Sequence, residues 1–134
     1  MNEFITDENE LAHAVIGIAI EIHKTLGPGL NQESYLECLK YELTQQNFQI
    51  ESNIERDLYY KNLKLSQGIH IDLLINNALV VEVETSENVS EIQIQKLLKS
   101  LKNGNYKLGL VINFNSTLLK NGIRRVSNSN QFEN

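Results

Sequence analysis

The stretch "ALVVEVETSENVSEIQIQKLLKSLKNGNYKLGLVIN", residues 78–113, decides the fold. Its first part, residues 78–84, is apolar and rich in valine, as a buried strand would be. Ser90 is a suitable N-cap for a helix through Lys102, because apolar residues then recur at helical spacing until Asn and Gly follow. Its last part, residues 108–113, is again a continuous apolar run. This order of strand, helix and strand predicts a βαβ unit with a parallel pair of strands.

The segments before this unit predict two helices followed by strands. Asp7 and Glu10 resemble a capping box for a first helix, which the segment around Pro28 ends, and a second helix is expected over residues 31–46. The other expected strands are 48–55, two short arms within 58–65, 69–75, and a short edge element within 121–126.

The composition is that of one folded domain. The chain has 134 residues, of which 41% are hydrophobic and 22% charged, enough for a single core. We place the domain over residues 1–126 and expect a polar, frayed tail over 127–134. The single cysteine, Cys38, cannot form an internal disulfide and occupies an apolar helix position typical of a buried thiol. Together with the lack of a signal peptide or a membrane-spanning apolar run, this favours a cytoplasmic protein without membrane contact.

The charges are unevenly distributed along the chain. The net charge of −5 argues against an indiscriminate nucleic-acid binder, but residues 91–134 carry seven basic and only two acidic side chains. Such a basic segment can contact phosphates, although solvated lysines of a helix or an edge strand give the same pattern. The candidate nucleic-acid-binding residues in it are Lys99, Lys102, Arg124 and Arg125.

The loop between the strands at 69–75 and 78–84 determines which polar side chains meet. A two-residue loop would pair Asp72 with Val81 and so set a polar face against an apolar one. A three-residue loop pairs Asp72 with Glu82 and brings all polar side chains of the two strands to one face. The pattern therefore favours the three-residue loop.

In this register the polar face carries His70, Asp72, Glu82 and Glu84. Strict alternation places Ile71 and Leu73 together on the opposite face. Like charges directly opposite one another are destabilising, and Mg²⁺ or Mn²⁺ bound by Asp72 and Glu82 would relieve the repulsion. The other interpretation is the ordinary solvated face of an antiparallel hairpin, which needs no ligand.

Several segments resemble the GxxExxY proteins, a family assigned to the PD-(D/E)XK nuclease-like superfamily. The segments that carry the resemblance are "NELAHAVIGIAIEIHKTLGPGL" at 9–30, "ECLKYEL" at 37–43, "IDLLINNALVVEVE" at 71–84, "LGLVINFN" at 108–115 and "LLKNGIRR" at 118–125. The fold that the resemblance implies is a restriction-endonuclease-like α/β core, in which helices flank a mixed sheet. The implied activity is metal-dependent phosphodiester hydrolysis of nucleic acid.

The resemblance also implies roles for individual residues. Asp72 matches the metal-binding Asp, and Glu82 matches the Glu of the family's E-x-K motif. Glu84 stands where this motif has its Lys, which in the superfamily helps to activate water and to stabilise developing charge. A carboxylate at this position opposes hydroxide formation and repels phosphate.

Two further motif positions depart from the family. In "GLNQESY", residues 29–35, Gln32 stands where the family's Glu is expected. In the helix that follows the E-x-K strand, Lys96 and Ser100 stand where the family has Gln and Tyr. Either the catalytic centre has decayed, or Lys96 reaches into the site and supplies the ammonium missing at Glu84.

The resulting hypotheses come from different classes. The first is a nuclease-like domain with impaired hydrolysis, in which Asp72, Glu82, Glu84 and Lys96 form the site and Asp72 and Glu82 would hold Mg²⁺ or Mn²⁺. The second is a non-catalytic module that binds nucleic acid or a protein. The third is a homodimer that forms through an exposed sheet edge.

Overall fold

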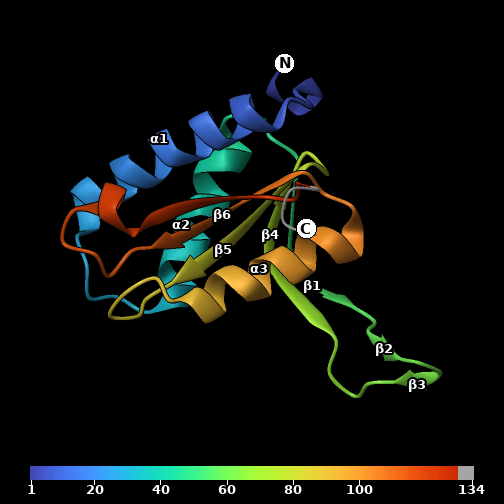
Figure 1. Ribbon diagram of the computed structural model, residues 1–134. Helices are drawn as coiled ribbons and strands as arrows, with labels where there is room; N and C mark the ends of the chain where they lie inside the picture. The colour runs from blue at the N-terminus through green and yellow to red at the C-terminus, as the bar shows by residue number, and fades with distance from the viewer. Residues whose placement is uncertain (130–134) are drawn as a thin grey trace.

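The computed structural model describes residues 1–129, which form a five-stranded sheet with helices on both faces (Figure 1). The helices are α1 (Glu8–Leu26), α2 (Gln32–Gln45) and α3 (Glu91–Gly104), with 3₁₀ turns at η1 (Asn2–Phe4) and η2 (Leu119–Gly122). The strands are β1 (Ile50–Arg56), β2 (Tyr59–Tyr60), β3 (Leu63–Lys64), β4 (Ile69–Ile75), β5 (Leu79–Glu84), β6 (Leu108–Asn113) and β7 (Ile123–Ser127). The expected mixed α/β class is confirmed.

The sheet has the order β1-β4-β5-β6-β7. Its only parallel pair among the described strands is β5 with β6, which α3 connects, so the predicted βαβ unit is confirmed. The antiparallel strands β1 and β7 form the two edges, and β2 and β3 make a separate arm that projects away from the sheet (Figure 1). The unit thus supplies β5 and β6, next to each other inside the sheet. The acids lie on β5 and on its other neighbour, β4.

Two hydrophobic cores lie on opposite faces of the sheet. Helices α1 and α2 cover one face, where Tyr35 of α2 is fully buried and stacks on Phe114 with ring centroids 4.4 Å apart. The Tyr35 hydroxyl donates to the carbonyl of Gly27 and accepts from the N–H of Leu30, which fixes the loop between the two helices. Helix α3 covers the other face with the buried Leu97 and Leu101.

The alternation of side chains along β4 slips by one residue in the middle of the strand. Ile71 and Leu74, three residues apart, both belong to the core under α3, whereas Leu73 belongs to the core under α1 and α2. The expectation that Ile71 and Leu73 share a face is therefore wrong. The facing residue of β1, Asn53, has a positive φ of 52° and is missing from the ladder that continues on either side of it. A residue in this conformation interrupts regular pairing, so the slip falls at Asp72.

The helix ends follow from local capping. Asp7 is the N-cap of α1 and accepts from the N–H groups of Asn9 and Glu10. Ser90 and Gln93 form a reciprocal capping box at the start of α3, which ends two residues later than expected, before the left-handed Asn105.

Strand pairing and hydrogen bonds fix the C-terminal end of the described chain. Ser127 still pairs with Leu108, and the Asn128 side chain donates to the carbonyls of Leu101 and Tyr106. The tail expected over 127–134 therefore does not begin at Ser127, and residues 130–134 lie outside the described part.

Candidate functional site

The candidate site lies where β4 and β5 separate. The last regular pair of their ladder is Leu73 with Val81, in the register that a three-residue loop produces, so the predicted register is confirmed. The next facing residues are Asp72 and Glu82. Beyond this point the two strands are joined through side chains.

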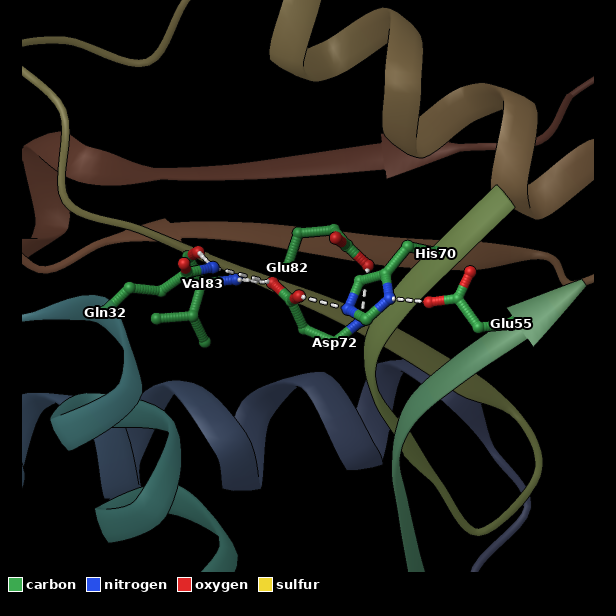
Figure 2. Close-up of polar contacts among 6 residues, drawn as sticks. All are labelled: Gln32, Glu55, His70, Asp72, Glu82 and Val83. Atoms are coloured by element: carbon green, nitrogen blue, oxygen red, sulfur yellow. Dashed lines mark hydrogen bonds and ion pairs between the residues drawn. The ribbon is translucent and has the colours of Figure 1, made fainter. Parts of the chain in front are cut away.

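The two carboxylates bind backbone groups across the gap. Asp72 Oδ2 accepts from the N–H of Val83 at 2.9 Å, and Glu82 Oε2 accepts from the N–H of Asp72 at 3.2 Å (Figure 2). Each acid thus replaces a hydrogen bond that the ladder no longer makes. Asp72 is only 5% exposed, so these bonds satisfy a carboxylate that has little access to water.

His70 holds the other oxygen of Asp72. Its Nε2 lies 3.2 Å from Asp72 Oδ1, and its Nδ1 contacts Glu55 Oε2 on the adjacent strand β1 (Figure 2). The hydrogen bond with Glu55, with a contribution from the charge of Asp72, raises the pKa of His70 above its ordinary value of 6.5. The imidazole therefore lies between two carboxylates, both of which favour its protonated form.

Gln32 reaches the same gap from the first residue of α2. Its Nε2 donates to the carbonyl of Val83 at 2.7 Å and to Asp72 Oδ2 at 3.4 Å (Figure 2). The stronger contact is the one to the carbonyl, since 3.4 Å is long for a hydrogen bond. One amide group thus joins the start of α2 to both strands of the site.

Burial changes the acidity of the two glutamates. Burial, reinforced by the charge of Asp72, raises the pKa of Glu82 from 4.5 to about 9. Burial and Asp72 also raise the pKa of Glu84, while the positive charge of Lys96 opposes the increase. At neutral pH a proton on Glu82 therefore removes one negative charge from beside Asp72.

Glu84 connects the cluster to α3. Its Oε1 accepts from Gln93 Nε2 at 3.2 Å, and the same amide nitrogen donates to Ser86 Oγ at 3.0 Å. Lys96 is an exposed residue of α3 that lies near enough to lower the pKa of Glu84, although no direct ion pair joins them. Ser100 is buried and donates to the carbonyl of Lys96, one helical turn earlier.

The arrangement of donors does not fit a divalent cation. Asp72 Oδ2 already accepts from the N–H of Val83 and from Gln32, the carbonyl of Val83 accepts from Gln32, and Asp72 Oδ1 pairs with the His70 imidazole. Within residues 1–129 no three His, Cys, Asp or Glu side chains converge as metal ligands would. A cation between these oxygens would have to displace the Gln32 amide.

The four candidate phosphate-binding residues divide between two faces. Lys99 and Lys102 are exposed on α3. Val126 of β7 packs under α3, so alternation places Arg124 on the same side of the sheet. Arg125 points to the α1 side, where its Nη2 donates to Asn9 Oδ1 at 2.6 Å. The structure therefore groups Lys99, Lys102 and Arg124, and separates Arg125 from them.

Sequence reasoning missed the roles of three groups: the Glu55 carboxylate, the Gln32 amide and the Val83 backbone. The departure of Gln32 from a family motif did mark this residue as unusual. The strand that holds Glu55 could not be placed beside His70 without knowledge of the sheet order. No side-chain pattern reports a backbone carbonyl.

A further cavity lies away from the acidic cluster. A groove of about 820 Å³ lies between α1 and α2, lined by residues such as Gly17, Cys38 and Tyr41, and none of its lining residues belongs to the acidic cluster. Cys38, expected to be buried, is half-buried at this groove. No helix within residues 1–129 is long and apolar enough to cross a membrane.

Comparison with known proteins agrees with this architecture. Residues 9–126 match the family model of the PD-(D/E)XK nuclease superfamily. No curated protein and no solved structure gave a significant match.

Proposed function

We propose that this chain, which belongs to the PD-(D/E)XK nuclease superfamily, is a nuclease-like domain of the GxxExxY type with impaired phosphodiester hydrolysis. Nucleases of this superfamily generally use a divalent metal, and Mg²⁺ or Mn²⁺ is what such chemistry would require here. The observation that carries the proposal is the position of Glu84. A carboxylate occupies the strand position at which the resemblance calls for a catalytic ammonium.

The charges around the site support this proposal. Glu82 lies beside Asp72, the charge of Asp72 also acts on Glu84, and Lys96, whose charge opposes this effect, makes no direct ion pair with Glu84. A scissile phosphate is itself anionic, and Glu84 places a carboxylate where the family's motif would offer it a balancing ammonium. Both binding of the phosphate in this gap and stabilisation of its transition state are therefore unfavourable.

A second candidate function is nucleic-acid binding without cleavage. Lys99, Lys102 and Arg124 share the α3 side of the sheet, and the two lysines lie on the same helix as Lys96. Solvated basic residues of this kind neutralise backbone phosphates and make binding dependent on salt. This function needs no chemistry at Asp72.

An active nuclease with a relocated lysine is the competing possibility. One observation favours it, namely that the charge of Lys96 reaches Glu84 and lowers its pKa. The Lys96→Ala variant isolates this contribution, because the exposed side chain of Lys96 makes no packing contact on which the core depends.

The test of hydrolysis uses single- and double-stranded DNA and RNA with Mg²⁺ or Mn²⁺. We expect the wild-type chain to cleave no faster than Asp72→Asn, which measures contaminating activity. Cleavage by the wild type that both Asp72→Asn and Lys96→Ala abolish would disprove the impaired-nuclease proposal.

The test of binding is fluorescence anisotropy at 50 and 200 mM salt. Three phosphate contacts would weaken the affinity roughly 40-fold over this range. The double variant Lys99→Ala/Arg124→Ala should reduce both the affinity and the salt dependence, whereas Arg125→Ala, on the other face, is the matched control. Salt-independent binding would contradict the phosphate contacts.

A further inference from the structure

The carboxamide of Gln32 lies between two oxygens that belong to different strands. Its single nitrogen is 2.7 Å from the carbonyl oxygen of Val83 in β5 and 3.4 Å from Asp72 Oδ2 in β4 (Figure 2). The N–H of Val83 donates to the same Oδ2 at 2.9 Å. A small donor group is therefore enclosed by oxygens at the exact point where the ladder opens.

The protein also supplies a partner for the second oxygen of Asp72. Asp72 Oδ1 is 3.2 Å from His70 Nε2, and Asp72 Oδ2 accepts from the N–H of Val83, so both oxygens of Asp72 have partners within the protein. His70 in turn contacts Glu55, which secures the imidazole at the edge of the cluster. Asp72 thus has a complete set of partners without any ligand, and no buried side-chain polar atom in residues 1–129 lacks a hydrogen-bond partner.

A divalent cation and the amide compete for the same oxygens. Mg²⁺ binds oxygen at about 2.0–2.1 Å and demands near-octahedral geometry. The amide nitrogen stands at hydrogen-bond distances from both oxygens, so a cation could reach them only after Gln32 had turned away. This movement would leave the Val83 carbonyl and Asp72 without the donor that joins them to α2.

We propose that the Gln32 amide takes the place of a divalent cation between Asp72 and Val83, so that this chain closes its site by hydrogen bonds and folds without metal. This inference deepens the proposed function and rests on it in one respect, since both take Asp72 as the centre of the site. It assigns Gln32 a positioning role: it fixes the start of α2 against the separated ends of β4 and β5.

The test replaces Gln32 with residues that change only its donor. Gln32→Glu exchanges the NH₂ group for a carboxylate oxygen of nearly the same size and so turns a donor into a metal ligand. Gln32→Met retains volume but provides neither donor nor ligand. Gln45→Glu makes the same chemical change at the exposed end of α2, where no acid cluster exists, and is the matched control.

Thermal unfolding of the full chain is measured in EDTA and in 1 mM Mn²⁺, with Mn²⁺ binding followed by calorimetry. We expect the Tm of the wild type and of Gln45→Glu to be unchanged by Mn²⁺. Gln32→Glu should unfold at a lower temperature in EDTA and gain about 5 °C or more in Mn²⁺. The double variant Asp72→Asn/Gln32→Glu should lose this gain, and Gln32→Met should be less stable than the wild type in EDTA.

Three results would overturn the inference. They are a rise of the wild-type Tm in Mn²⁺ that Asp72→Asn abolishes, a Gln32→Glu variant that fails to respond to Mn²⁺, and a Gln32→Met variant as stable as the wild type. Failure of the proposed function is a separate result, because it is measured by cleavage of nucleic acid. Mn²⁺ binding by the wild type without cleavage contradicts only the role of Gln32.

Discussion

Asp72 and Glu82 face each other across β4 and β5 and are linked through the backbone. Glu82 Oε2 accepts from the N–H of Asp72 at 3.2 Å, while Asp72 Oδ2 accepts from the N–H of Val83, the next residue after Glu82, at 2.9 Å. Loss of either carboxylate would leave a backbone donor of the opposite strand without its partner. The two acids therefore have a structural role that is independent of any chemistry they perform.

The raised pKa of Glu82 predicts that stability falls as pH rises. In the folded state the pKa is about 9 and the ordinary value is 4.5, so between these values the folded chain holds a proton that the unfolded chain has released. This contribution to the free energy of unfolding is therefore fully present below pH 4.5 and is lost as the pH rises to 9. The slope is at most about 1.4 kcal/mol per pH unit for one proton.

Urea unfolding in EDTA at pH 6 and pH 8.5 measures this effect. Glu82→Gln retains an oxygen that can accept from Asp72 but cannot ionise, so its stability should change much less with pH. Glu51→Gln, at an exposed residue of β1, is the control and should behave as the wild type. Equal pH dependence of Glu82→Gln and the wild type would contradict the prediction.

His70 should titrate above its ordinary value of 6.5. The hydrogen bond with Glu55 is the main cause of its raised pKa, so Glu55→Gln should lower this pKa. The titration is followed by NMR of the imidazole nitrogens. Glu51→Gln lies on the same strand but pairs with Leu74 and should leave the titration of His70 as it is. An unchanged value in Glu55→Gln would show that the ion pair is absent in solution.

Gln93 should stabilise the chain through the start of α3. Its side chain completes the capping box with Ser90 and also donates to Glu84, so Gln93→Ala should lower the free energy of unfolding by about 1 kcal/mol. Gln93→Glu retains the acceptor of the capping box but places a carboxylate against Glu84. It should be destabilised more at high pH than at low pH, as urea unfolding at both values would show; a pH-independent loss would exclude a contribution from Glu84.

Substitution of two glycines by alanine should change the free energy of unfolding in opposite directions. A Cβ at Gly109 of β6 would lie 2.8 Å from a methyl carbon of the fully buried Leu97, so Gly109→Ala should cost roughly 1–3 kcal/mol. A Cβ at Gly17 of α1 would meet no atom within 4 Å, and Gly17→Ala should stabilise the helix by up to about 1 kcal/mol. Denaturant melts of both variants compare the two outcomes directly, and destabilisation by Gly17→Ala would contradict the open space found beside this residue.

Much of this fold could be predicted because its signals are local. The apolar runs around α3 identify the parallel pair, the capping residues Asp7 and Ser90 mark the starts of two helices, and the distribution of polar residues is enough to select the register between Asp72 and Glu82. Each of these signals depends on residues close together in the sequence.

The details that could not be predicted depend on distant segments. The slip in β4 accompanies the positive φ of Asn53, a residue on the neighbouring strand β1. Because of this slip, Ile71 lies on the face opposite Leu73. The contact of Gln32 with Val83 requires the packing of α2 against the sheet, which no periodicity describes. The resemblance identified Gln32 as unusual, but its two partners, Asp72 and Val83, follow only from the folded structure.

The stacking of Tyr35 on Phe114 provides a spectroscopic probe of this region. The chain contains no tryptophan and five tyrosines, so its near-ultraviolet signal comes from tyrosine and phenylalanine. Tyr35 is fully buried, holds the loop before α2 through its hydroxyl, and follows Gln32 by one helical turn. Circular dichroism near 280 nm should therefore report the immobilisation of the start of α2 without any added label.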